Sequence, residues 1–143
     1  MIRHFDHITF VVSDVPAARR FFELLGFVEE KSVVISGGRF EAFMGIGGIE
    51  AEHHTLVLAG KPRQEVQLLK YLRPLPIANA DLASLRQMGF NHICFAVDDI
   101  EAEVRRLEAH GIERRNEVME FHDRKLVFLR GPEGITVELA QWL

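Results

Sequence analysis

Apolar residues recur along the chain with two different periods. In short runs they are β-branched or alternate with polar residues, which is typical of strands, and elsewhere they recur every three or four positions, as in amphipathic helices. Helical spacing occurs in two segments, between Asp14 and Gly26 and between Asp99 and Gly111. Strand signals occupy 7–12, 31–37, 52–60 and 65–72, and again 92–97, 114–121, 124–131 and 135–142. Each half of the chain is therefore predicted to run as one strand, one helix and three strands.

The two strand–helix segments are also similar in sequence. Residues 6–27 (DHITFVVSDVPAARRFFELLGF) and 91–112 (NHICFAVDDIEAEVRRLEAHGI) are identical at nine of 22 positions without a gap. The identical pairs are His7/His92, Ile8/Ile93, Phe10/Phe95, Val12/Val97, Asp14/Asp99, Ala17/Ala102, Arg20/Arg105, Glu23/Glu108 and Gly26/Gly111. The shared aspartates stand where helix N-caps belong, and the shared glycines stand just past each helix. We infer an internal duplication.

This repeat predicts the domain organisation. The chain is expected to be one α+β domain, 1–143, made of two tandem βαβββ modules. The first module should span 1–73 and the second 91–143, joined by a connector at 74–90 that contains one short helix.

Each module begins its first strand with a histidine. Because successive side chains on a strand point to opposite faces, His7 should lie opposite Phe10, and His92 opposite Phe95. The bulky face is expected to lie under the helix, so the histidine face should look away from it.

Polar residues interrupt the last strand of each module in matching places. Gln67 stands within VQLL and Glu138 within VELA. A carboxylate buried in a strand requires a cation or a hydrogen-bond partner. The strand EAEHHTLVL adds two adjacent histidines, of which the register favours His53, with Thr55, on the inner face rather than His54.

Composition and charge exclude several classes of protein. The formal net charge is −4, which does not favour binding to nucleic acid or to an anionic membrane. No apolar run is long enough to span a membrane, and the N-terminus lacks a signal-peptide core. The single cysteine, Cys94, excludes an internal disulfide and fits a reducing compartment, so we expect a cytoplasmic protein.

The stretches DHITFVVSD, NHICFAVDDI and LRGPEGITVELAQ resemble the vicinal oxygen chelate superfamily of glyoxalases, bleomycin resistance proteins and dioxygenases. The likeness is greatest to methylmalonyl-CoA epimerase and to lactoylglutathione lyase-like proteins. The resemblance implies that the two modules form a curved mixed sheet around one divalent metal. It would place that metal on His7, Gln67, His92 and Glu138.

The implied donor set suits a particular chemistry. Two imidazoles and two oxygen donors suit Co, Ni, Zn, Mn or Fe(II), and four protein ligands leave two octahedral positions open. A metal there could act as a Lewis acid beside a carbonyl and stabilise an enolate, with Glu138 as the base. The resemblance thus implies a lyase or isomerase: an acyl-CoA epimerase, or a glyoxalase-type lyase, acting on an acyl-thioester or an α-keto compound. An epimerase needs a second acid or base, for which His53 is the candidate.

Two other functions are compatible with the same fold. One is a small Fe(II) extradiol-type dioxygenase, although ligands spread over both modules favour proton transfer. The other is a non-catalytic protein that binds a small molecule, such as a resistance protein. Members of the superfamily are commonly homodimers, so a homodimer is expected.

Overall fold

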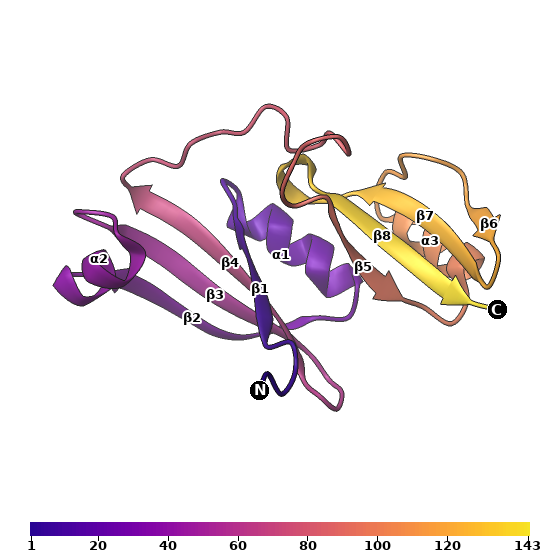
Figure 1. The fold of residues 1–143 in the computed structure, drawn as a ribbon, viewed down its shortest axis with the longest axis horizontal. Coiled ribbons are helices and arrows are strands. Elements are labelled where there is room, and N and C mark those ends of the chain that lie inside the picture. Colours follow the sequence, from indigo (N-terminus) through magenta and orange to yellow (C-terminus); the bar gives the residue numbers. More distant parts are fainter. The chain divides into compact units, whose positions relative to one another are not determined.

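In the computed structural model the 143 residues form two compact units, Met1–Ala78 and Asn79–Leu143, which are described separately (Figure 1). The elements of unit 1 are β1 (His7–Val11), α1 (Val15–Leu24), β2 (Val28–Ser36), α2 (Gly38–Met44), β3 (Glu50–Leu58) and β4 (Gln64–Arg73). Its four strands form one sheet in the order β1-β4-β3-β2. β1 runs parallel to β4, and the other neighbours are antiparallel.

Unit 2 repeats this topology. Its elements are β5 (His92–Ala96), α3 (Ile100–Ala109), β6 (Met119–Phe121), β7 (Arg124–Arg130), a 3₁₀ turn (Pro132–Gly134) and β8 (Thr136–Trp142). The sheet order is β5-β8-β7-β6, and β5 is parallel to β8. The predicted α+β class with a repeated βαβββ order is therefore confirmed. No helix of either unit is long and apolar enough to cross a membrane.

The repeated helices begin and end as their shared residues predict. The Asp14 carboxylate accepts a hydrogen bond from the Ala17 amide at 3.0 Å, and Asp99 accepts one from Ala102 at 2.9 Å. Both aspartates are therefore N-caps that satisfy an otherwise unpaired amide of the first turn. The duplication thus preserved the device that starts each helix.

Three local predictions were wrong. The connector at 74–90 contains turns but no helix, because Asn79 and Ser84 accept hydrogen bonds from backbone amides two residues further on and so compete with helix formation. The helix α2 was not predicted. The strand expected at 114–121 is reduced to β6, and before it only Arg114 forms a single bridge with the β7 strand.

Each sheet buries one face under its own helix. In unit 1, Phe22 of α1 is fully buried, and its ring is stacked on Phe10 at a centroid distance of 5.6 Å. In unit 2 the helix residues Ile100, Val104 and Leu107 are buried. The histidine-bearing face of each first strand lies opposite, so the predicted strand parity is confirmed.

Candidate functional site

In unit 2, β5 and β8 bring His92 and Glu138 together on the face away from α3. Cys94 pairs with Glu138 in the sheet, and His92 stands two residues before Cys94, so all three side chains lie on the same face. His92 Nε2 is 3.3 Å from Glu138 Oε2, and the Glu138 side chain is only 13% exposed. We call this pair the unit 2 half-site.

The tautomer of His92 follows from its neighbours. Asn91 Nδ2 donates to the Leu85 carbonyl at 2.7 Å, so the Asn91 amide must turn its oxygen toward His92. That oxygen lies 2.7 Å from His92 Nδ1, which therefore carries the hydrogen. In the neutral ring the Nε2 atom then faces Glu138 with a lone pair, whereas a protonated ring would form an ion pair with this carboxylate. Two lone-pair donors at this separation are mutually repulsive unless a proton or a cation lies between them.

Cys94 is the other side chain that contacts Glu138. Desolvation, followed by a hydrogen bond to the Glu138 carboxylate and its charge, raises the pKa of the thiol to about 12. At neutral pH Cys94 is therefore a protonated hydrogen-bond donor to Glu138, and it lacks the thiolate character that a nucleophile requires.

A pocket of about 270 Å³ opens beside Glu138. It is lined by Asn116, Met119, Phe121, Leu126, Val127, Phe128 and Glu138. The volume is nearly twice the roughly 150 Å³ of an apolar cavity that holds benzene. Glu138 is the only charged residue of the lining, so the pocket suits an uncharged apolar group larger than a single ring.

In unit 1, His7 and Gln67 occupy the equivalent positions on β1 and β4. His7 is the register partner of Glu65, and Thr9 is the partner of Gln67, so all four share one face. His7 Nδ1 is 2.6 Å from Asp6 Oδ1. An ionised carboxylate can only accept, so Nδ1 carries the hydrogen, and in the neutral ring Nε2 then has the lone pair. The same hydrogen bond holds the pKa of the Asp6 carboxyl below its usual value.

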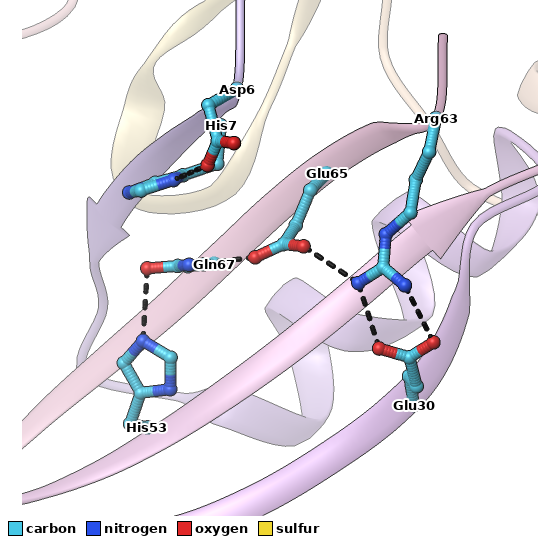
Figure 2. Close-up of polar contacts among 7 residues, drawn as sticks. All are labelled: Asp6, His7, Glu30, His53, Arg63, Glu65 and Gln67. Atoms are coloured by element: carbon cyan, nitrogen blue, oxygen red, sulfur yellow. Dashed lines mark hydrogen bonds and ion pairs between the residues drawn. The ribbon is translucent and has the colours of Figure 1, made fainter. Parts of the chain in front are cut away.

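Gln67 is held by the side chains of Thr9, His53 and Glu65, of which Figure 2 shows the last two. Its Oε1 accepts from Thr9 Oγ1 at 3.1 Å and lies 2.9 Å from His53 Nε2, while its Nε2 donates to Glu65 Oε1 at 2.7 Å. Burial opposes ionisation of Glu65, but the hydrogen bonds from Gln67 and Arg63 lower the pKa of its carboxyl overall. We call His7 and Gln67 the unit 1 half-site.

Of the predicted site residues, the structure brings His92 next to Glu138 and His53 next to Gln67. The contact with Gln67 confirms that His53 lies on the inner face, while His54 lies on the helix face, 3.4 Å from a Glu52 oxygen. No group of three or more His, Cys, Asp or Glu side chains is arranged as a metal site.

Sequence reasoning missed the residues that orient the site. Asp6 and Asn91 hold the two histidines, and they occupy the same position of the repeat, directly before each histidine. The dipeptides Asp-His and Asn-His were therefore a signal for them. Glu65 had no such signal, because its role depends on strand register.

Comparison with known proteins identifies the family. The model of the Glyoxalase/Bleomycin resistance protein/Dioxygenase superfamily matches residues 4–139. The chain belongs to this superfamily. A glyoxalase family protein from Bacillus cereus is 29% identical, with a TM-score of 0.90 over 100% of this chain and 96% of that one. The predicted superfamily and its fold are thus confirmed.

More distant relatives have named activities. A 54-residue segment, 38% of this chain, is 37% identical to glyoxalase I of Saccharomyces cerevisiae (strain ATCC 204508 / S288c), and this match covers only 17% of that protein. The fosfomycin resistance protein FosX from Listeria monocytogenes, in complex with Mn(II) and sulfate, has a TM-score of 0.65 at 16% identity. That similarity covers 100% of this chain and 95% of FosX, and at this identity it shows the fold alone.

Proposed function

We propose that this protein is a divalent-metal-dependent enzyme that moves a proton on a carbon next to a carbonyl, as an acyl-CoA epimerase or a glyoxalase-type lyase does. His7, Gln67, His92 and Glu138 are the proposed ligands of one Co, Ni, Zn, Mn or Fe ion. The observation that carries the proposal is the matched state of the two histidines. In each half-site the preceding residue binds Nδ1 and leaves the Nε2 lone pair available.

The donor geometry of the unit 2 half-site fits a shared ion. Metal–nitrogen and metal–oxygen bonds of about 2.1 Å place neighbouring octahedral ligands about 3.0 Å apart. The 3.3 Å between His92 Nε2 and Glu138 Oε2 is close to this value. Ligating histidines usually donate their other ring N–H to a carboxylate or a carbonyl oxygen, as His7 and His92 do.

The relatives support the same class of activity. The name of the yeast relative is glyoxalase I, and the FosX structure contains Mn(II). A bound divalent cation would supply Lewis-acid polarisation of the substrate carbonyl. Its ligands in this chain would be neutral nitrogen and amide oxygen donors together with the one carboxylate.

The residues of the chain take distinct roles in this proposal. Glu138 is the base that removes the α-proton, and the Cys94 thiol holds its carboxylate by a hydrogen bond. The apolar pocket beside Glu138 accommodates the substituent on the reacting carbon. His53 lies on the inner face of unit 1 and is the candidate for the second proton-transfer group.

We also propose that the protein is a cytoplasmic homodimer. Light scattering would measure its assembly state.

The test is solvent exchange of the α-proton. The metal-loaded protein would be incubated in D₂O with 2-methylacyl thioesters and with hemithioacetals of α-keto aldehydes, each carrying an apolar substituent. Deuterium incorporation would be followed by NMR. Glu138→Gln should slow exchange by roughly 10²–10⁴-fold, the usual contribution of a general base. The matched control is Glu113→Gln, which removes an exposed carboxylate 3.3 Å from Arg130.

Other results would replace the proposal. Exchange that Glu138→Gln leaves unchanged would eliminate Glu138 as the base. Oxygen uptake with catechols by the Fe(II)-loaded protein would indicate a dioxygenase. Saturable binding of these compounds without exchange would indicate a non-catalytic binding protein.

A further inference from the structure

A continuous chain of polar contacts leads from the edge of the unit 1 sheet to Gln67 (Figure 2). Arg63 donates to both carboxylate oxygens of Glu30, each at 2.7 Å, and its Nη2 also donates to Glu65 at 2.7 Å. Glu65 in turn accepts from Gln67 Nε2, and Gln67 Oε1 faces His53. The chain links β2, β4 and β3, three neighbouring strands of one sheet.

In this series of hydrogen bonds, the donor and the acceptor of each bond can be assigned in only one way. The Arg63 guanidinium can only donate, so the carboxylate that receives it accepts. Glu65 likewise accepts from Gln67 through its other oxygen, and only the NH₂ group of the amide can donate to it. The Gln67 oxygen must then face His53, whose Nε2 at 2.9 Å must carry a hydrogen.

We propose that Glu65, held in place by Arg63, is the positioning residue that fixes the orientation of the Gln67 amide and thereby the Nε2–H tautomer of His53. This inference rests on the proposed function for its purpose, because the oxygen is the only end of the Gln67 amide that can ligate a metal. A bound ion would take the place of one of the two hydrogen bonds that this oxygen accepts from Thr9 and His53. A flipped Gln67 would present its NH₂ group, which has no available lone pair, to the same space.

Unit 2 shows why one half-site needs this device and the other does not. The position equivalent to Glu65 is Thr136, the register partner of His92, and its hydroxyl receives a hydrogen bond from Arg115. The proposed metal ligand two residues after Thr136 is Glu138, a carboxylate with two equivalent oxygens. An amide has one oxygen and one nitrogen end, so Gln67 alone has an orientation to fix.

The side-chain exposures are consistent with a preformed arrangement. The Glu65 side chain is 17% exposed, whereas those of Arg63 and Glu30 are 48% and 49% exposed. The ion pair at the sheet edge is therefore open to solvent, and the carboxylate in contact with Gln67 is the more enclosed part. Substitution of Glu65 should consequently have a larger effect than substitution of Arg63.

The direct test is the tautomer of His53 in the metal-free protein. Long-range ¹H–¹⁵N correlation spectra report which ring nitrogen carries the hydrogen, and the spectrum of His53→Asn assigns the His53 signals. In the wild type at a pH where the ring is neutral, we expect Nε2–H. Glu65→Gln can accept or donate, so its spectrum should show a mixture of tautomers. Arg63→Met should give a smaller change in the same direction.

The matched control is Glu23→Gln, which removes a carboxylate of the same unit that lies 3.6 Å from Arg19 on α1. It should leave the His53 signals as in the wild type. Backbone amide spectra of every variant verify that the fold is retained. An Nδ1–H tautomer in the wild type, or unchanged His53 signals in folded Glu65→Gln, would overturn the inference.

A second readout separates this inference from the proposed function. Glu65→Gln should weaken Co(II) binding, followed by absorbance, by roughly 10–100-fold, as loss of an outer-shell partner does in other metal sites. If the wild type binds no Co(II), the proposed function fails while the tautomer result stands. If the wild type binds Co(II) and folded Glu65→Gln binds it equally well, the positioning role fails.

Discussion

The two half-sites share a scaffold but hold their proposed oxygen ligands, Gln67 and Glu138, in different ways. In unit 1 the neutral donor Gln67 is fixed on both ends, by Thr9 and His53 at its oxygen and by Glu65 at its nitrogen. In unit 2 the charged donor Glu138 has only His92 and a thiol as partners, and it borders an apolar pocket.

This difference indicates a division of roles after duplication. The features common to both units are the histidine, the acceptor before it, the aspartate cap and the strand order. The features that differ are the charge of the oxygen donor and what surrounds it. Under the proposed function, unit 1 orients a metal ligand, whereas unit 2 supplies the proton-transfer group and the space for a substrate.

The hydrophobic cores of the two units extend the comparison to stability, because the aromatic packing of Phe22 has no counterpart at Leu107. Phe22 and Leu107 occupy equivalent positions of the repeat, and both are fully buried. Phe22→Ala should lower the free energy of unfolding by about 3–5 kcal/mol. Leu107→Ala should cost about 1 kcal/mol less, because Phe22 also has ring contacts with Phe10, Phe21 and Phe27 that add to area burial.

Chemical denaturation monitored by circular dichroism measures both values. The same experiment on Val28→Ala, an exposed position of unit 1, is the control and should change the free energy of unfolding by less than about 0.5 kcal/mol. A larger loss for Leu107→Ala than for Phe22→Ala would contradict the view that aromatic packing sets unit 1 apart.

The residues before the two histidines provide a smaller and more specific test. Asp6→Ala and Asn91→Ala each remove the acceptor at Nδ1, so each should weaken metal binding by roughly 10–100-fold. Titration with Mn(II) or Co(II) by calorimetry measures the affinity. Asp98→Ala, an exposed aspartate next to the α3 N-cap, is the control and should bind as the wild type does.

Equal effects of Asp6→Ala and Asn91→Ala would mean that the half-sites contribute equally to metal binding. A loss confined to Asn91→Ala would assign the ion to unit 2 alone.

Much of the fold was predictable because its signals are local. Period-two and helical spacing located most elements, and the coincidence of caps with histidines revealed the duplication. Strand parity placed Phe10 under a helix and His7 opposite, and the structure agrees. The superfamily was identified from the same short stretches.

The errors arose where side chains compete with the pattern or where partners come from another strand. Asn79 and Ser84 form local hydrogen bonds that replaced the expected connector helix with turns. The roles of Glu65 and Arg63 depend on which residues face each other across β2, β3 and β4, which no single segment encodes. The metal ligands and the catalytic roles of Glu138 and His53 remain predictions.

The central claim is that both units contribute ligands to one divalent ion. Co(II) titration of the metal-free protein, with metal content checked by mass spectrometry, tests it most directly. We predict one ion per chain in the wild type, and loss of binding in both His7→Asn and His92→Asn. The same substitution at His122, an exposed residue with φ 50° where asparagine is tolerated, should leave binding intact. Full binding in either His7→Asn or His92→Asn would contradict the claim.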